Sequence, residues 1–179
     1  MVIISNKMKG CFMPIKTLYD LMVDELRNIY HAEKQVTKTF PKMIKTANST
    51  ELKTYFEENI KQTDNQITRL EKIFKELDVP IKPKKCLGME GILNEGRELF
   101  NEDIDPNVID AALVTNEQRI EHYEITTYDT VRTYAKKLGL NNIAKMLQDT
   151  YDEDIWTNKK LLTFIENNVH TEVFHNEVR

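Results

Sequence analysis

The stretch "RIEHYEITTYDTV" (residues 119–131) places Glu121 and Glu124 three residues apart inside an otherwise helical pattern of apolar residues. Residues three apart lie on the same face of a helix, so the two carboxylates reach the same region of the fold. Burying an ionised carboxylate costs on the order of several kcal/mol, and neighbouring carboxylates also repel one another. A metal cation, bound protons or hydrogen bonds must compensate for this cost. The stretch therefore predicts a long helix with acidic groups on its buried face.

The composition of the whole chain favours one all-α domain. Its 179 residues are enough for a single domain with a real hydrophobic core. Five glycines and five prolines, in a chain with 40% apolar and 30% charged residues, provide too few turns for a many-stranded protein and suit long amphipathic helices. The formal net charge is −4, without the basic excess that binds phosphate, so we expect no nucleic-acid partner.

The sequence contains no segment typical of export or of membrane insertion. The amino-terminal stretch "MVIISNKMKGCFMPIK" (residues 1–16) has a three-residue apolar run, far shorter than the core of a signal peptide. No stretch approaches the roughly 18 apolar residues of a membrane span. Cys11 and Cys86 are the two cysteines, which implies no disulfide framework and suits a reducing compartment. We therefore expect a cytoplasmic protein without a membrane partner.

Residues that start and stop helices divide the chain into four long helices and one short helix. Asn48 or Ser49 can cap a helix that begins near residue 50, and Asp105 followed by Pro106 can start another. Gly139 can end that helix in the left-handed conformation. The predicted helices cover residues 14–47, 50–77, 88–101, 106–138 and 141–167.

The lengths of the connections predict the topology. The first two long helices, and likewise the last two, are joined by only a few residues, so each pair forms an antiparallel hairpin. The connection over residues 78–105 is long enough to cross the bundle and contains the short helix. We therefore predict a ferritin-like four-helix bundle over residues 14–168, with flexible segments at 1–13 and 169–179. An up-down-up-down bundle with a bulky loop is the alternative topology.

Each long helix carries a polar residue in a seven-residue series of apolar positions that faces the core. Glu33 interrupts this series in the first helix, and Thr63 interrupts it in the second. In the third long helix Glu117 and Glu124 occupy the core series, and in the fourth Asp154 does so. Polar residues at similar depth on four helices converge on one point inside a bundle.

This pattern partly matches a dinuclear metal site. In di-iron and di-manganese bundles, two helices each supply a Glu and the other two each supply Glu-x-x-His. Glu33 and Glu124 fit the lone carboxylates, and Glu121 adds a carboxylate one turn earlier. The predicted metal ligands are Glu33, Glu121, Glu124 and Asp154. We expect Mn, Fe or another divalent cation if metal binds, and the all-oxygen set suits hard cations or Mn(II) better than a redox-active iron pair.

Three segments of the chain resemble a known family. The YciF-like family of bacterial stress-associated proteins, within the ferritin and rubrerythrin superfamily, is similar to "YHAEKQVTKTFPKM" (residues 30–43), "KKCLGMEG" (residues 84–91) and "DAALVTNEQRIEHYEITTYDT" (residues 110–130). The resemblance covers about residues 15–168. It implies a ferritin-like four-helix bundle that forms a homodimer, and it implies no particular activity.

The similarity to rubrerythrin stops short of its complete metal site. It rests on the predicted glutamate ligands and on Tyr128. Rubrerythrin-like proteins have Glu, His and His where this chain has Thr63, Gln66 and Thr157. We therefore do not carry over oxidase or peroxidase activity, and we assign no catalytic residue.

Four other residues receive structural interpretations. His122 follows Glu121 directly and His31 precedes Glu33 by two residues, but a helix turns about 100° per residue, so both histidines are expected at the surface or boundary. Cys86 is expected to be a structural thiol, and Trp156 is expected to pack.

Two functions remain open from the sequence. The first is a ferritin-like, stress-associated protein whose buried carboxylates bind one or two divalent metals. The second is a metal-free, dimeric helical scaffold that keeps the carboxylates as a hydrogen-bonded polar core and acts through another protein. Apolar residues in "LGMEGILNEGRELF" (residues 87–100) also favour a homodimer, because a monomer need not bury all of them. Whether the protein is an enzyme stays open.

Overall fold

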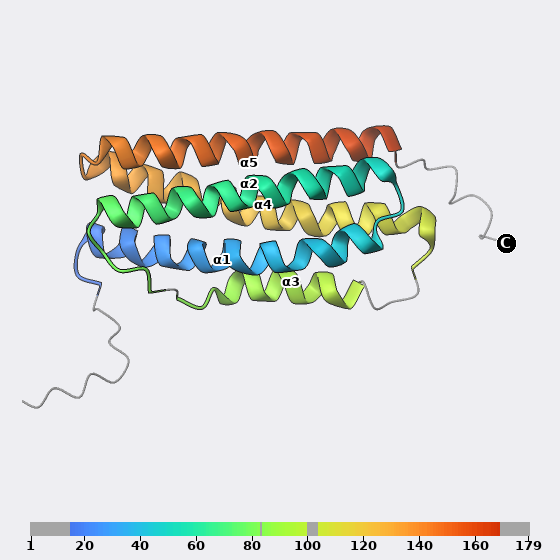
Figure 1. Cartoon of the computed structure of the whole chain (residues 1–179), viewed down its shortest axis with the longest axis horizontal. Helices are drawn as coiled ribbons and strands as arrows, with labels where there is room; N and C mark the ends of the chain where they lie inside the picture. Colours follow the sequence, from blue (N-terminus) through green and yellow to red (C-terminus); the bar gives the residue numbers. More distant parts are fainter. Residues whose placement is uncertain (1–14, 83, 100–103, 169–179) are drawn as a thin grey trace, which may run out of the picture.

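A computed structural model describes residues 15–82, 84–99 and 104–168, which contain five α-helices and no strand. The predicted all-α class is therefore confirmed. The predicted flexible segments at residues 1–13 and 169–179 lie outside the described residues. The helices are α1 (Leu18–Thr46), α2 (Thr50–Glu76), α3 (Leu87–Leu99), α4 (Pro106–Lys137) and α5 (Asn141–Asn168), as Figure 1 shows.

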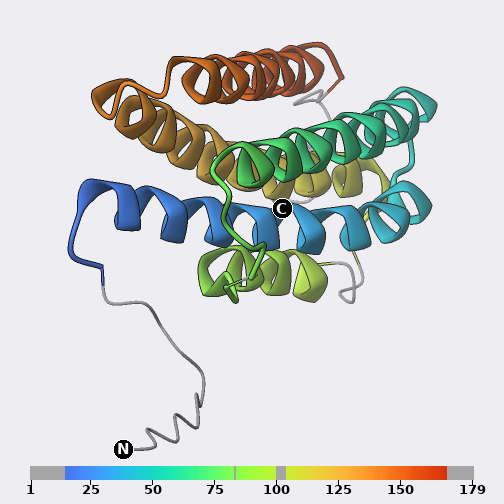
Figure 2. The ribbon, with the colours of Figure 1, turned by 60° about the vertical axis from the view of Figure 1, so that its left-hand side comes forward.

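The four long helices form a bundle of two hairpins, as the connection lengths predict. Helix α1 packs against α2 and α4 packs against α5, while contacts of α1 with α4 and of α2 with α5 join the hairpins. The short helix α3 belongs to the crossover and packs against α1 and α4, and Figure 2 shows it on the outside of the bundle beside α1. None of the described helices is long and apolar enough to cross a membrane.

The ends of α1 and α4 are fixed by local hydrogen bonds and backbone conformation. The Thr17 side chain accepts a hydrogen bond from the Asp20 backbone N–H at 3.1 Å, and the Asp20 carboxylate accepts one from the Thr17 backbone N–H at 2.9 Å. This capping box starts α1 at Leu18, so the predicted start at residue 14 is one helical turn too early. Gly139 has a φ of 73° and follows α4 in the left-handed conformation, as predicted.

The turn between α1 and α2 is closed by a residue of α4. The Ser49 side chain accepts a hydrogen bond from the Leu52 backbone N–H at 3.0 Å and caps α2. The Asp110 carboxylate accepts hydrogen bonds from the backbone N–H groups of Asn48 and Ser49 at 2.7 and 2.8 Å. The start of α4 therefore holds the first hairpin at its turn.

One apolar core runs along the bundle and includes residues of all five helices. Burying a large apolar side chain contributes roughly 1.5–3 kcal/mol relative to leaving it exposed, so this core supplies most of the drive for folding. The largest fully buried apolar side chains include Met22, Leu26, Phe40, Phe56, Phe74 and Met89.

The prediction that Trp156 is a packing residue is wrong. The residue is 57% exposed, and the Lys160 ammonium lies 3.8 Å from the centre of its ring. The next residue, Thr157, is only 3% exposed and faces inward instead. Because successive helix residues are about 100° apart, an inward Thr157 turns its neighbour toward solvent.

Candidate functional site

Five buried carboxyl groups from three helices form what we call the carboxylate cluster. Glu33 belongs to α1, Glu117, Glu121 and Glu124 belong to α4, and Asp154 belongs to α5. Their exposed fractions are 0, 0, 3, 5 and 1%, in that order. The glutamates of α4 are three or four residues apart, so they share its inward face. All four predicted ligands are therefore buried, and Glu117 joins them.

Three of the predicted ligands meet at one point. One carboxylate oxygen each from Glu121, Glu124 and Asp154 lies within 4.8 Å of the other two. Hard cations bind oxygens at about 2.0–2.6 Å, so one cation between these atoms can contact all three. Glu33 is outside this group of three. After burial, the charge of Glu33 is the next largest cause that raises the pKa of Glu124 and of Asp154.

Tyr128 of α4 holds Glu33 in place. The Tyr128 ring is fully buried, and its hydroxyl donates a hydrogen bond to Glu33 Oε1. Burial and the charge of Glu33 raise the pKa of Tyr128 well above its usual value. The hydroxyl therefore keeps its proton at neutral pH and acts as a donor to the carboxyl group.

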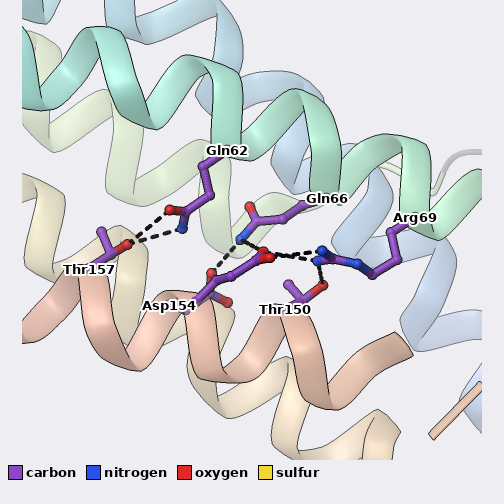
Figure 3. Close-up of polar contacts among 7 residues, drawn as sticks. Gln62, Gln66, Arg69, Thr150, Asp154 and Thr157 are labelled. Carbon is purple, nitrogen blue, oxygen red and sulfur yellow. Dashed lines mark hydrogen bonds and ion pairs between the residues drawn. The ribbon is translucent and has the colours of Figure 1, made fainter. Parts of the chain in front are cut away.

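Two amide side chains of α2 hold two further carboxyl groups. Asn59 Nδ2 donates a hydrogen bond to Glu117 Oε1 at 2.8 Å. Gln66 Nε2 donates one to Asp154 Oδ1 at 2.6 Å, as Figure 3 shows. Both donors are buried and neutral, so they orient the carboxyl groups without supplying a compensating positive charge.

Every member of the carboxylate cluster also has one buried oxygen without a hydrogen-bond partner among the described residues. Buried polar atoms in native proteins are nearly always hydrogen-bonded, and leaving one unpartnered costs about 1–3 kcal/mol. Five such oxygens among these buried carboxyl groups indicate that a cation, water or bound protons complete the cluster. The five atoms are Glu33 Oε2, Glu117 Oε2, Glu121 Oε2, Glu124 Oε1 and Asp154 Oδ2.

Burial is the main cause of raised carboxyl pKa values throughout the cluster. It raises the pKa of Glu33 to about 7 and that of Glu117 to about 8. The pKa values of Glu121, Glu124 and Asp154 lie well above their usual range, because the charges of neighbouring carboxylates add to the effect of burial. Without a cation, burial and mutual repulsion therefore favour the protonated form of these carboxyl groups.

An ion pair lies beside the cluster between α2 and α5. The Arg69 guanidinium donates to both carboxylate oxygens of Glu153, at 2.8 and 2.9 Å, and to Thr150 Oγ1 at 2.5 Å (Figure 3). Burial dominates the raised pKa values of Glu33 and Asp154, and the Arg69 charge lowers both while the Glu153 charge raises both. The ion pair as a whole therefore does not neutralise the carboxylate cluster.

The positions that carry Glu and His in rubrerythrin-like proteins are buried here but hold other groups. Thr63, Gln66 and Thr157 are 5, 2 and 3% exposed. Gln66 donates to Asp154, and the Thr157 hydroxyl accepts a hydrogen bond from Gln62 Nε2 at 3.0 Å (Figure 3). Gln66 and Thr157 therefore contact their neighbours through hydrogen bonds.

Sequence reasoning missed two residues of the site. Glu117 lies on the buried series of its helix, yet the predicted ligand set omits it. Asn59 is not among the predicted site residues at all. A signal for it exists, because Asn59 follows Phe56 by three residues and precedes Thr63 by four, the spacing of one helix face.

His31, His122 and Cys86 are not members of the carboxylate cluster. His31 Nδ1 accepts a hydrogen bond from the Cys86 backbone N–H at 3.2 Å, and His31 is half-buried. His122 is exposed. The prediction of boundary or surface histidines is therefore confirmed. The Cys86 thiol is fully buried, with its Sγ 3.0 Å from the Tyr123 hydroxyl oxygen, which agrees with a structural thiol.

Comparison with known proteins identifies relatives over most of the chain. A family model described as "Domain of unknown function (DUF892)" matches residues 17–174. Protein YciF from Escherichia coli strain K12 is 35% identical over 159 residues, which cover 88% of this chain and 96% of that protein. The family match contains every member of the carboxylate cluster.

Solved structures share the fold. The crystal structure of the E. coli stress protein YciF has a TM-score of 0.84 at 34% identity and covers 88% of this chain and 100% of that chain. The structure of YcfI from Rhodopseudomonas palustris has a TM-score of 0.82 at 37% identity and covers 86% and 98%. A protein from Xanthomonas campestris, at 18% identity and a TM-score of 0.66 over 84% and 92%, shares the fold alone.

Proposed function

The chain belongs to the DUF892 family of YciF-like proteins, and on that basis we propose that its carboxylate cluster holds one or two divalent cations inside the bundle. Its relative in E. coli is a stress protein, and we propose a stress-associated role in the cytoplasm for this chain as well. We assign no reaction to the site.

The observation that carries the proposal is the unpartnered oxygen on each buried carboxyl group. In Glu33, Glu117 and Asp154, one oxygen accepts a hydrogen bond from a neutral donor and the other is left free. Side chains that bind metal are commonly oriented by such outer hydrogen bonds, which leave the ligand atom available. The same arrangement has no benefit in a purely apolar core, where every unpartnered oxygen is a cost.

The residues present fit a hard cation. Glu121, Glu124 and Asp154 would hold it first, since their oxygens already lie together, and Glu33 would complete the predicted set. All of these donors are carboxylate oxygens, which suit Mn(II), Mg(II) or Ca(II) more than metals that require nitrogen or sulfur ligands. A bound cation would supply positive charge, and would drive protons off the carboxyl groups that ligate it.

Metal binding to protein purified without chelator tests the proposal. We expect elemental analysis to find a divalent metal, and Mn(II) added to the metal-free protein to raise its melting temperature as free Mn(II) increases. Glu124→Gln should abolish most of that shift, because it removes a ligand charge at nearly constant shape. Glu95→Gln, at an exposed glutamate paired with Arg119, is the matched control and should keep the shift.

A melting temperature that Mn(II), Fe(II) and Zn(II) all leave unchanged would exclude the cation site. The same conclusion would follow if Glu124→Gln and Glu95→Gln responded to the metals equally, since binding would then lie elsewhere on the surface. In either case the metal-free helical scaffold remains as the proposed function.

The second proposed function is a metal-free helical scaffold, and the raised carboxyl pKa values favour it. With pKa values of about 7 and 8, Glu33 and Glu117 can stay protonated at neutral pH and donate as well as accept hydrogen bonds. A protonated network needs no cation. Acid should then leave the protein intact or stabilise it, and metals should have no effect on melting.

Both functions are compatible with a homodimer, which we propose from the family resemblance and from apolar groups near the crossover. Leu87 and Ile81 are 68% and 38% exposed in the single chain. Light scattering at micromolar concentration should give twice the 21.1 kDa of one chain. A mass of 21.1 kDa would reject the dimer and leave the metal question unaffected.

A further inference from the structure

The polar residues between α2 and α5 range from partly exposed at the outside to buried at the carboxylate cluster. The side chains of Glu153 and Arg69 are 34% and 20% exposed, whereas Gln66 and Asp154 are 2% and 1% exposed. The ion pair therefore lies on the solvent side of the carboxylate cluster. Figure 3 shows Arg69, Gln66 and Asp154 following one another along this boundary between the two helices.

One amide connects the outer and inner carboxylates. Gln66 Nε2 donates to Asp154 Oδ1 at 2.6 Å and reaches Glu153 Oε2 at 3.4 Å. Asp154 Oδ2 is buried and has no partner among the described residues. Glu153 and Asp154 are thus neighbouring carboxylates around one donor, the first half-buried with a bound guanidinium and the second buried with a free oxygen.

The outer surface of α5 beside this ion pair is acidic. Asp149 lies one turn before Glu153, and Asp149 and Asp152 are both exposed. The pKa of Arg69 is raised, chiefly by its hydrogen bond with Glu153 and also by the charge of Asp149. Acidic surface of this kind raises the local concentration of cations.

A cation that reached the cluster between α2 and α5 would pass the polar groups that close this boundary. The inner contacts there are hydrogen bonds between flexible polar side chains, such as Gln62 with Thr157 and Gln66 with Asp154. The outer contact is the Arg69–Glu153 pair, whose guanidinium makes three hydrogen bonds to α5. Such contacts can open by side-chain rotation, without separating apolar surfaces.

We propose that the Arg69–Glu153 pair is a latch on the access route to the carboxylate cluster, and that Glu153 is the outer carboxylate which passes a divalent cation to Asp154. When closed, the latch fills the route with the Arg69 guanidinium. When Arg69 swings away, the freed Glu153 carboxylate receives the cation beside Gln66 and Asp154. This inference rests on the proposed cation site and adds two residues to it.

The rate of Mn(II) uptake by the metal-free full chain tests the latch, measured as loss of the free-ion paramagnetic resonance signal after mixing. Arg69→Gln should speed uptake about tenfold or more, because it removes a repelling charge and frees Glu153. Glu153→Gln should slow uptake several-fold, because the outer ligand is gone and the positive charge of Arg69, no longer neutralised by Glu153, repels the cation. The double variant should be slower than Arg69→Gln alone.

A matched control uses the exposed Arg119–Glu95 pair, which has an N–O distance of 3.0 Å. Arg119→Gln should leave the rate of Mn(II) uptake unchanged. Melting temperatures of all variants without metal show whether each one is folded, so a slower or faster rate is interpreted only for folded protein.

The possible outcomes separate the two proposals. If the ion pair merely fastens α2 to α5, then Arg69→Gln, Glu153→Gln and the double variant will all speed uptake, and the latch is rejected. Equal rates in all variants also reject it, while leaving the cation site intact. If no variant, including the unmodified chain, binds Mn(II) after prolonged incubation, the cation site itself is rejected and the latch with it.

Discussion

The two hairpins of the bundle carry their buried polar groups in different chemical forms. Among the described residues, the α1–α2 hairpin buries one carboxyl group and several neutral groups, namely Glu33 with Thr39, Asn59, Thr63 and Gln66. The α4–α5 hairpin buries four carboxyl groups, namely Glu117, Glu121, Glu124 and Asp154. The first hairpin therefore mainly supplies donors, and the second mainly supplies acids.

Hydrogen bonds pair the two sets across the boundary between the hairpins. Asn59 of α2 donates to Glu117 of α4, and Gln66 of α2 donates to Asp154 of α5. Each hairpin alone would leave these groups without their partners, so the site forms together with the docked bundle. Apart from the Tyr128–Glu33 pair, in which the roles are reversed, the donors and the acids of this cluster therefore come from different hairpins and can be changed separately.

The largest effect expected from the buried carboxyl groups of both hairpins is a strong pH dependence of the metal-free protein. The pKa values of Glu33 and Glu117 are raised from 4.5 to about 7 and about 8, chiefly by burial. The folded protein then binds more protons than the unfolded chain between about pH 4.5 and 8, so stability falls as pH rises through this window. We expect a loss on the order of 5 kcal/mol, measured by urea unfolding at a series of pH values.

Excess Mn(II) should weaken this dependence of stability on pH. Ligated carboxylates give up their protons to the metal, so the bound protein should lose much less stability as pH rises. A metal-free profile that is flat or rises from pH 5 to 8 would contradict the raised carboxyl pKa values and remove the energetic difference between the hairpins.

A neutral substitution in the α4–α5 hairpin, which supplies most of the buried acids, should stabilise the metal-free protein. Glu117→Gln keeps an acceptor oxygen for Asn59 and removes a group whose ionisation opposes folding at neutral pH. We expect the free energy of unfolding at pH 7 to increase by about 3 kcal/mol. At pH 4.5 the gain should disappear, since the carboxyl group is then protonated. Glu95→Gln, at an exposed position, should change stability by less than about 0.5 kcal/mol at either pH.

A substitution in the α1–α2 hairpin, which supplies most of the buried donors, should destabilise the protein instead. Gln66→Leu removes the hydrogen bond to Asp154 and leaves that buried carboxyl group without its donor. We expect urea unfolding to show a loss of about 2 kcal/mol at pH 7. Asn65→Leu, at the exposed position next to it on α2, is the control and should be nearly neutral. Similar losses for the two variants would mean that the hydrogen bond does not matter.

The smallest effect concerns Glu33, the single buried acid among the described residues of the α1–α2 hairpin. Burial raises the pKa of Glu33, and the hydrogen bond from Tyr128 partly offsets this rise. Tyr128→Phe keeps the buried ring and removes the hydroxyl, so we expect a loss of about 1 kcal/mol and a further increase in the pKa of Glu33. Carboxyl titration by NMR measures the shift. An unchanged pKa would show that Tyr128 does not orient Glu33.

The fold was largely predictable because its signals are local. Ser49 caps a helix wherever its side chain can reach a free backbone N–H, and Gly139 favours a left-handed end in any context. The short connections then force hairpins. The start of α1 differs from the predicted one, because Thr17 and Asp20 form a capping box that competes with the proline signal three residues earlier.

The acids of the candidate site are predictable from the sequence, whereas its amide donors Asn59 and Gln66 are not. Glu33, Glu124 and Asp154 lie on seven-residue core series, and the period alone indicates their burial. Gln66 shows in the sequence only as a missing histidine. Its bond to Asp154 depends on how α2 is positioned along α5, which is set by packing between segments about ninety residues apart.

The contact of Asp110 with the first turn makes that turn a reporter of assembly. The Asn48 and Ser49 amides are hydrogen-bonded to a carboxylate more than sixty residues further along the chain. A first hairpin that forms early, before α4 arrives, leaves both amides exchanging with solvent. In a pulse-labelled refolding experiment these two amides should therefore become protected later than those inside α1 and α2, which marks the moment at which the two halves of the protein meet.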